Sequence, residues 1–411
     1  MSGSTLTLIY SGNLDGELEP CGCTLEGDFG GIQRRATLLD ELRHKLHEPV
    51  VISSGGLLVS GFTSDVLKNE YILKGIAALD YDAIGLQWND LAFGIEFLRR
   101  FNLPWLASNW NDDSFSRVRQ ITRGEHSLAV FAWLNPETSP YRKMRGSHEM
   151  AANDVPALNR MISRAKGEGS TTILMTSVSL AEVEERLSLD DVDILIIKSA
   201  YEKYGKPVRD GRTLVLQPGS RGMRLGRLDL TLAQNGDVAS WQHEVIPLGV
   251  DVPDSPRLQA WYDEYNAKVE AAYRESVERI KAQTTGESPY AGAQACQTCH
   301  GEAHEKWQAS LHSGAYHKLE EVKKAFDPAC IVCHTVGFNK PGGFIDIDTT
   351  PQLANVQCES CHGASRRHVD SGGKKTVANT GWPPTRMCAQ CHTPAHSPSF
   401  HFENYWPKIA H

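Results

Sequence analysis

Over residues 1 to about 250, short runs of consecutive apolar residues alternate with stretches whose apolar residues recur every three or four positions. The first pattern is typical of buried strands, and the second of helices with one buried face. The predicted strands are 6–10, 49–53, 83–86, 128–132, 172–175, 194–197, 214–217 and 226–230, and the predicted helices are 31–45, 65–79, 95–101, 155–167 and 180–187. This alternation predicts a layered α/β domain over residues 1–252.

A single charge-rich helical pattern follows this domain. Ser255 is a candidate N-cap, and Pro256 suits the first helical position. The pattern runs to about Lys281 and ends in a segment rich in Thr, Gly, Ser and Pro. We expect residues 253–289 to form a linker helix between two domains, and a last helix packed on the first domain is the alternative.

From residue 290 onward the long apolar runs vanish, while Gly, Pro, His and Cys become frequent. A segment of about 120 such residues buries too little apolar surface to fold alone. We therefore expect residues 290–411 to form a mainly α-helical, loop-rich domain whose core comes from another source.

The cysteines of this segment indicate that source. Eight of the ten cysteines form four Cys-x-x-Cys-His motifs, which are Cys296–Cys299–His300, Cys330–Cys333–His334, Cys358–Cys361–His362 and Cys388–Cys391–His392. Two thiols at this spacing add to the two vinyl groups of a c-type haem, and the adjacent histidine reaches the iron. A zinc knuckle or a redox dithiol is the alternative for one motif, but neither needs a histidine in the same place four times. We expect four c-type haems, which would supply the core.

The second axial ligand of each iron is expected to be histidine. Met387 is the single methionine of the segment and stands beside Cys388, whereas seven histidines lie outside the motifs. Paired histidines without methionine indicate low reduction potentials. Seven histidines exceed the four positions, so several are expected to be surface side chains.

The stretches Trp307-Gln-Ala-Ser-Leu-His312, Cys330-Ile-Val-Cys-His-Thr-Val-Gly and Val356-Gln-Cys-Glu-Ser-Cys-His-Gly resemble the tetrahaem cytochrome c family of nitrifier electron carriers. The resemblance covers about residues 293–396. It implies that His312 and His368 are distal ligands, with His317 and His396 as further candidates. It also implies that the haem of His334 is the one with an open iron position.

Segments of the first domain resemble the metallophosphoesterase domain of secreted 5'-nucleotidases. They are residues 8–16, 53–58, 83–94 and 214–229. In the motifs that hold two metal ions in that family, this chain has Asn13, Asp15, Gly56, Trp88 and Asn89. Dinuclear hydrolysis needs carboxylates, His and Asn around both ions. We therefore expect the fold without the hydrolase, used for docking, for ligand binding or for shielding the haems.

Cys21 and Cys23 lie in a Gly-containing loop near the face that would be the active site. A disulfide within Cys-x-Cys is strained, so self-pairing is not expected. A soft metal, a reactive sulfur species and a disulfide to a partner all suit two such thiols, and an inert pair is the alternative. Asp15, Asn89 and Asn109 are candidate neighbours of a small-molecule site there.

The bulk composition limits the partners. A net charge of −8 argues against nucleic acid. No run of about 20 apolar residues predicts a transmembrane segment. Because c-type haem is attached after export, we expect a periplasmic or extracellular protein whose numbering starts near the mature end.

The expected function is electron transfer between redox partner proteins. The sequence favours an electron carrier over a catalyst. The partners could include copies of the chain itself, in a filament with His411 or His401 donated by a neighbour. The alternatives are a haem-based reductase or oxidase of a small nitrogen or sulfur compound, and a metal-dependent phosphoesterase.

Overall fold

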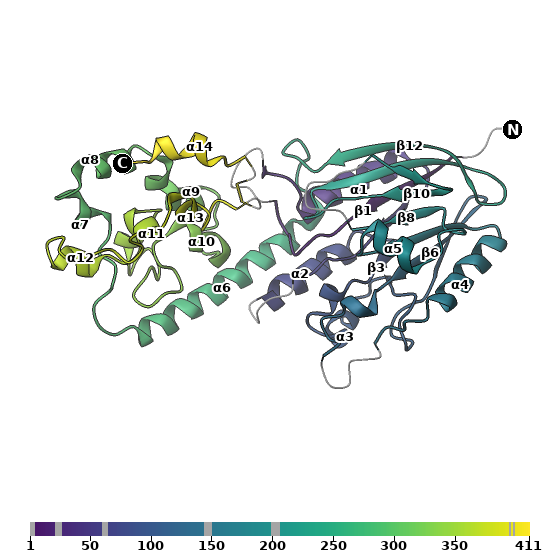
Figure 1. Cartoon of the computed structure of the whole chain (residues 1–411), viewed down its shortest axis with the longest axis horizontal. Helices are drawn as coiled ribbons and strands as arrows, with labels where there is room; N and C mark the ends of the chain where they lie inside the picture. The colour runs from purple at the N-terminus through teal and green to yellow at the C-terminus, as the bar shows by residue number, and fades with distance from the viewer. Residues whose placement is uncertain are drawn as a thin grey trace. The chain divides into compact units, whose positions relative to one another are not determined.

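The computed structural model describes residues 5–20, 27–59, 65–143, 150–198, 206–393, 396–397 and 399–411. The chain divides into two compact units, Met1–Trp261 (unit 1) and Tyr262–His411 (unit 2) (Figure 1). The boundary falls inside α6 (Gln259–Gln283), the helix that the charge-rich pattern predicts.

Unit 1 contains two six-stranded sheets. The first has the order β12-β11-β1-β2-β3-β4, and the second has the order β5-β6-β7-β8-β10-β9. The strands are β1 (Thr5–Ser11), β2 (Val50–Ser53), β3 (Ala83–Gly85), β4 (Trp105–Leu106), β5 (Arg119–Arg123), β6 (His126–Trp133), β7 (Thr171–Thr176), β8 (Ile194–Ile196), β9 (Val208–Asp210), β10 (Thr213–Leu216), β11 (Arg224–Leu232) and β12 (Val238–Pro247). The strands β1 to β4 run parallel to one another, and so do β6, β7, β8 and β10.

The main core of unit 1 is built from alternating residues of both sheets. In β11, Leu228, Leu230 and Leu232 are buried, since every second side chain of a strand points to the same face. They form one apolar cluster with residues of β1, β2, β6, β7, β8 and β10. Sheets packed through such faces form a sandwich.

Helices cover the outer faces. They are α1 (Ile32–Lys45), α2 (Asp65–Ala77), α3 (Ile95–Arg99), α4 (Val155–Gly167) and α5 (Leu180–Arg186). Leu158 and Ile162 of α4 and Val183 of α5 pack on the second sheet. The Asp154 side chain caps α4 by accepting a hydrogen bond from the Ala157 amide.

This architecture confirms the predicted α/β class, with every predicted strand and helix present. The sequence patterns missed β4, β5, β9 and β12, which are the edge strands of the two sheets. β12 has only one buried residue, Val238, so its sequence lacks a continuous apolar run.

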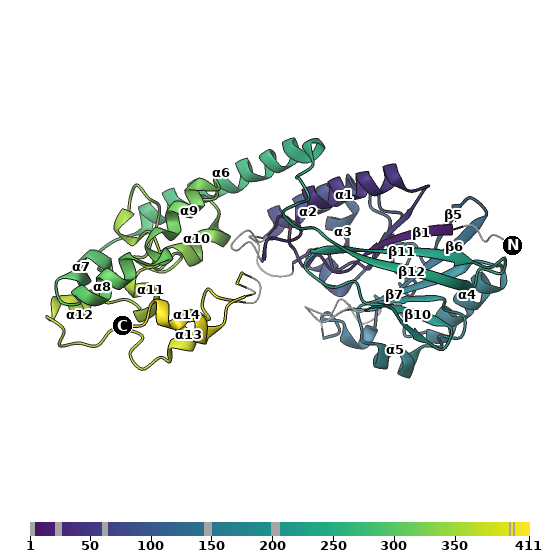
Figure 2. The same cartoon turned by 90° about the horizontal axis from the view of Figure 1, so that it is seen from above.

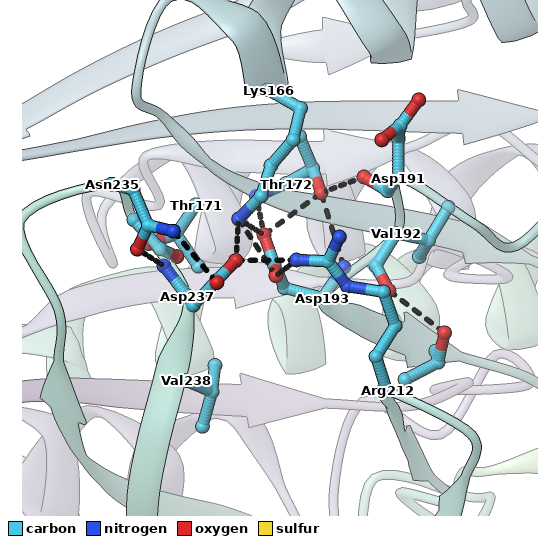
Figure 3. A network of polar contacts seen from close by, with 12 residues as sticks. Lys166, Thr171, Thr172, Asp191, Val192, Asp193, Arg212, Asn235, Asp237 and Val238 are labelled. Atoms are coloured by element: carbon cyan, nitrogen blue, oxygen red, sulfur yellow. Dashed lines mark hydrogen bonds and ion pairs between the residues drawn. The ribbon is translucent and has the colours of Figure 1, made fainter.

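A polar network joins the amino ends of the parallel strands in the second sheet (Figure 3). The buried Asp193, just before β8, accepts hydrogen bonds from Lys166 at 2.8 Å, from Arg212 at 3.0 Å and from the Thr172 amide at 2.9 Å. Lys166 also pairs with Asp237 at 2.8 Å. The network fixes the end of α4 against β7 and β8.

Unit 2 is mainly helical and loop-rich, as expected. Its helices are the second part of α6 and α7 (Ala293–Gln297), α8 (Gly301–Gln308), α9 (Ala315–Glu321), α10 (Pro328–His334), α11 (Cys358–His362), α12 (Arg366–Asp370), α13 (Pro384–Cys388) and α14 (Phe402–Tyr405). In the described part of the chain, no helix is long and apolar enough to cross a membrane.

Unit 2 has a small apolar core, more than the sequence pattern predicts. Tyr273 and Val277 of α6 pack there with residues such as Ile331, Phe338 and Leu353. The predicted linker helix therefore contributes to this core. The second motif region contributes Ile331 to this core.

Candidate functional site

Each Cys-x-x-Cys-His motif lies on about one turn of helix. In the first motif the amide of His300 donates to the carbonyl of Cys296 at 2.9 Å, and His392 repeats this bond with Cys388 at 2.9 Å. Residues three and four positions apart share one helix face. One turn therefore places both thiols and the histidine of each motif on the same side.

Three of the four motif histidines face a second histidine. The ring centroids are 6.1 Å apart for His300 and His368, 6.2 Å for His392 and His312, and 5.8 Å for His362 and His411. Two imidazoles on opposite sides of one metal ion, with bonds of roughly 2 Å each, have ring centres about 6 Å apart. The spacing of all three pairs fits a shared iron.

Hydrogen bonds at Nδ1 orient several of these rings. Nδ1 lies 2.6 Å from the Ala315 carbonyl in His334, 2.7 Å from the Lys375 carbonyl in His368 and 2.9 Å from the Ile409 carbonyl in His411. A carbonyl can only accept, so Nδ1 is the donor in each of these bonds, which directs Nε2 away from the carbonyl. This second contact is the usual way in which proteins orient a metal-binding histidine.

The protonation of the rings agrees with metal binding. Burial lowers the pKa of His312, His362 and His392, and neighbouring histidines lower each further. The three imidazoles are therefore neutral at neutral pH, which is the state that binds metal.

The remaining predicted ligands lie elsewhere. His317 is exposed and contacts Glu320 at 3.1 Å and Glu321 at 3.4 Å. His396 is also exposed, and its amide donates to the Thr393 carbonyl at 3.0 Å. His411 was predicted only as a ligand donated to a neighbouring copy. The sequence signal for its pairing with His362 was its place among the spare histidines.

His334 differs from the other three motif histidines. Among the described residues, no aromatic or histidine ring pairs with it. The charge of His334 contributes, after burial, to the lowered pKa of His312, which pairs with His392. The open iron position at His334 stays a prediction.

The four motifs lie beside one another in a definite order. The Gly292 amide donates to the Glu359 carboxylate at 2.8 Å and the Ala293 amide to the Gln357 side chain at 2.7 Å, which joins the first and third motif regions. A hydrogen bond from the Cys391 thiol, and then the charge of His396, lower the pKa of Cys333, so the second and fourth motifs also adjoin. Burial, followed by the nearby Cys388, raises the pKa of Cys361 to about 11, which relates the third motif to the fourth.

The surroundings of the motifs fit a large apolar group. Leu311 and Val332 expose 91% and 50% of their surface, although they stand next to His312 and Cys333. The buried His304 has no hydrogen-bond partner for Nδ1. Among the described residues, no three His, Cys, Asp or Glu side chains form a metal-ion site. The exposed apolar side chains beside the motifs and the unpartnered nitrogen of His304 suit haem.

In unit 1 a buried carboxylate occupies the predicted remnant of the metal site, at the carboxyl ends of β1, β2 and β3. Asp90 is fully buried and accepts hydrogen bonds from the amides of Gly56 at 2.9 Å, Leu57 at 2.7 Å and Gln87 at 3.0 Å. Burial raises the pKa of Asp90 to about 6, although these amides oppose the shift.

The replaced ligand positions bond to one another around this carboxylate. Gln87 donates to Asn13 at 2.9 Å, and Asn13 donates to Asp15 at 3.2 Å. A Cβ on Gly56 would lie 2.5 Å from the Asn13 side chain. No room exists for a larger residue such as aspartate at position 56.

The other predicted neighbours also make internal bonds. Asp15 accepts from the Arg221 amide at 3.1 Å, and Asn89 donates to the Leu58 carbonyl at 3.1 Å. Asn109 donates to the carbonyls of Leu134 and Ala152. These side chains are used for structure. Cys21 and Cys23 lie outside the described residues.

Known cytochromes and known nucleotidases each match part of the chain. Residues 295–363 match the family described as "Cytochrome c554 and c-prime". The Cytochrome c-554 of Nitrosomonas europaea is 32% identical over 137 residues, which are 26% of this chain and 58% of the relative. The matched range contains the first three Cys-x-x-Cys-His motifs, and the fourth lies beyond it.

The other half is similar to nucleotidases. The 5'-nucleotidase of Bos taurus is 21% identical over 275 residues, covering 59% of this chain and 48% of that protein. The structure of a 5'-nucleotidase precursor from Thermus thermophilus has a TM-score of 0.56 at 15% identity, covering 85% of this chain and 74% of that one. A sulfate thiohydrolase from the same organism, SoxB, has a TM-score of 0.54 at 18% identity, with 64% and 60% covered.

These matches confirm both resemblances and the 5'-nucleotidase-like fold. The chain spans about half the length of the relatives that it matches in sequence, at 58%, 48% and 50%. The cytochrome match supports covalently bound haem in unit 2 and a role in haem electron transfer.

Proposed function

We propose that the chain is a multihaem c-type cytochrome that carries electrons between redox partner proteins. The observation that carries this proposal is the set of three histidine pairs, each with one histidine from a Cys-x-x-Cys-His motif. Four haems would be attached through the thiols of Cys296, Cys299, Cys330, Cys333, Cys358, Cys361, Cys388 and Cys391. When bound, each haem supplies a one-electron couple.

The pairs suggest the axial ligands. We assign His300 with His368, His392 with His312, and His362 with His411 as three bis-histidine sets. His334 holds the fourth iron alone. This assignment replaces His317 and His396 with His411, because those two are not placed opposite a motif histidine.

The second ligand of the third motif comes from the same chain. The Lys306 ammonium donates to the Ala410 carbonyl, and His411 follows in the position opposite His362. The proposal therefore needs no ligand from a neighbouring copy. The neighbouring motifs give the order first, third, fourth, second for electron passage.

The assignment of His411 is tested by His411→Ala in the full holoprotein. We expect four haems per chain by pyridine haemochrome assay in both proteins, and one additional high-spin ferric centre in the variant by electron paramagnetic resonance. His401→Ala is the matched control, because His401 is exposed and close in sequence to His411. An unchanged spectrum for His411→Ala would contradict the assignment, and fewer than four haems in the parent would contradict the count.

The lone His334 favours a second candidate, which is binding or reduction of a small molecule at an open iron. Carbon monoxide should then shift the spectrum of one haem among four in the reduced protein. A spectrum that carbon monoxide leaves unchanged would remove this candidate.

We also propose that unit 1 is a non-hydrolytic domain and that the protein works outside the cytoplasm. The support for the first point is the Asp90–Gln87–Asn13 cluster, whose polar groups bond to one another where the metal ligands would stand. Hydrolysis of AMP in the presence of added manganese would contradict it. The support for the second is the need to attach c-type haem after export.

A further inference from the structure

We propose that an acidic redox protein docks on a basic surface next to the first motif, formed by Arg367, Lys374 and Lys375 and called here the α12 surface. This inference rests on the proposed function in one respect, which is that the partner exchanges electrons.

The first motif is the most exposed of the four. Cys299 and His300 are both exposed, whereas the cysteines and histidines of the other three motifs are all partly buried. Electron transfer to another protein requires a centre near the surface. The first motif is also one end of the order first, third, fourth, second, so it is a natural place for electrons to enter or leave.

The α12 surface is fixed to the proposed distal ligand of this motif. His368 Nδ1 lies 2.7 Å from the Lys375 carbonyl, and the Gly373 amide donates to the His368 carbonyl at 2.9 Å. The Lys375 amide donates to Ser371 Oγ at 3.0 Å. The backbone that carries the lysines is therefore held at a set place beside the His300–His368 pair.

The cationic side chains of the surface are available. Arg366 is used internally, since it donates to the Tyr290 carbonyl at 3.0 Å. Arg367, Lys374 and Lys375 are exposed and have no ion pair among the described residues. The one acidic residue between them in sequence is Asp370.

The charge of this region is opposite to that of the whole chain, which is −8. In Figures 1 and 2, α12 and α9 lie at separate places in unit 2, and α9 exposes Glu320 and Glu321. Glu302 and Glu305 are exposed on α8, which begins at the other ligand, His300. An acidic partner would meet carboxylates at α8 and α9 and a cluster of unpaired cations at α12, which steers and orients docking.

The test uses flavodoxin, an acidic one-electron protein, as the probe, with the full oxidised holoprotein. Binding is measured by surface plasmon resonance at low and high salt. The variant is Arg367→Glu/Lys374→Glu/Lys375→Glu. We expect it to bind at least about tenfold more weakly at low ionic strength, with the difference lost near 0.5 M salt, where the Debye length falls to a few ångström.

The control has the same change in net charge at another place in unit 2. It is Arg279→Glu/Lys323→Glu/Lys340→Glu, three exposed residues without an ion pair among the described residues. Equal weakening by both triple variants, or no weakening by the α12 variant, overturns the proposal. If the α12 triple variant misfolds by circular dichroism, the three single reversals are measured, each expected to weaken binding by about threefold.

A separate measurement isolates the proposed function. Haem content and reduction by dithionite are recorded for all proteins. Loss of haem in the parent would contradict the electron-carrying function, whereas binding is scored from the salt-dependent difference between the two variants.

Discussion

The two units of this protein differ in what their polar and metal-binding side chains contact. In unit 1, the side chains at the positions where the 5'-nucleotidase resemblance implies metal ligands bond to one another, as in the chain of Gln87, Asn13 and Asp15. In unit 2, three motif histidines face three others across a distance of about 6 Å that suits one bound iron each. The polar side chains of this cluster in unit 1 satisfy one another, whereas the histidine pairs of unit 2 leave room for a cofactor.

The difference lies in what satisfies the polar groups. A buried polar group without a partner is costly, so a buried side chain must supply hydrogen bonds to the backbone amides around it. Asp90 does this for the loop at Gly56–Leu58. In unit 2 the corresponding stabilisation is expected to come from the haems.

The largest expected effect is the loss of folding in unit 2 when haem cannot attach. It tests whether the stability of unit 2 depends on haem. Changing all eight motif cysteines to serine removes the thioether attachment. We expect the calorimetric unfolding transition of unit 2 to disappear, because its small apolar core cannot offset the conformational entropy of about 150 residues. The transition of unit 1 should remain.

The control is the parent protein with its haems reduced, which should show both transitions. A cooperative unit 2 transition in the variant with eight serines would contradict this expectation, because the apolar core would then stabilise unit 2 without haem.

The sequence patterns predicted the strands with continuous apolar runs and the location of both sites. They could not predict β12, which alternates and is largely exposed, or β5, with one buried residue. Nor could they show the role of Asp90, because all but one of its backbone hydrogen bonds come from residues more than 30 positions away, at Gly56, Leu57 and Leu58.

The distal ligands were only partly predictable, for a related reason. His312 and His368 stand in stretches that resemble a known family, although their partners His392 and His300 are 80 and 68 positions away, whereas His411 stands in no such stretch. Only folding of unit 2 brings its ring to 5.8 Å from that of His362.

The next largest effect concerns the ion pairs around Asp193 in unit 1, which Figure 3 shows. Asp193→Ala leaves the nearly buried Lys166 and part of Arg212 without the central carboxylate. Removing one partner of a buried ion pair costs about 3–5 kcal/mol in free energy of unfolding. Urea unfolding of unit 1 measures this loss, with the exposed Asp113→Ala as control. A loss below about 1 kcal/mol would mean that Asp237 compensates for Asp193.

A smaller effect, visible in pH dependence, concerns Asp90. Its pKa in the folded chain is about 6, above its ordinary value of 3.8. The folded state therefore holds the proton more tightly, and the stability from the neutral form is full below about pH 4 and lost as pH rises through 6. The loss is about 3 kcal/mol at 1.36 kcal/mol per pKa unit.

Asp90→Asn should remove this slope. Unfolding free energies of unit 1 at pH 4 and pH 7 in both proteins give the difference, and other titrating groups cancel. Equal slopes in parent and variant would show that Asp90 does not titrate in this range.

The smallest expected effect concerns Arg35, a buried residue of unit 1 whose hydrogen bonding is incomplete. Arg35 is fully buried, donates to the Tyr81 hydroxyl at 2.9 Å and to the Gly222 carbonyl at 3.0 Å, and has no partner for Nε and no carboxylate contact among the described residues. Burying a charge without a counter-ion is unfavourable. Arg35→Met keeps the volume and removes the charge, so we expect the free energy of unfolding to change by less than about 1 kcal/mol in either direction. Arg35→Ala, the control, leaves a cavity and should cost about 2–5 kcal/mol. If methionine costs as much as alanine, the guanidinium bonds to Tyr81 and Gly222 stabilise unit 1 by more than the burial of the charge destabilises it.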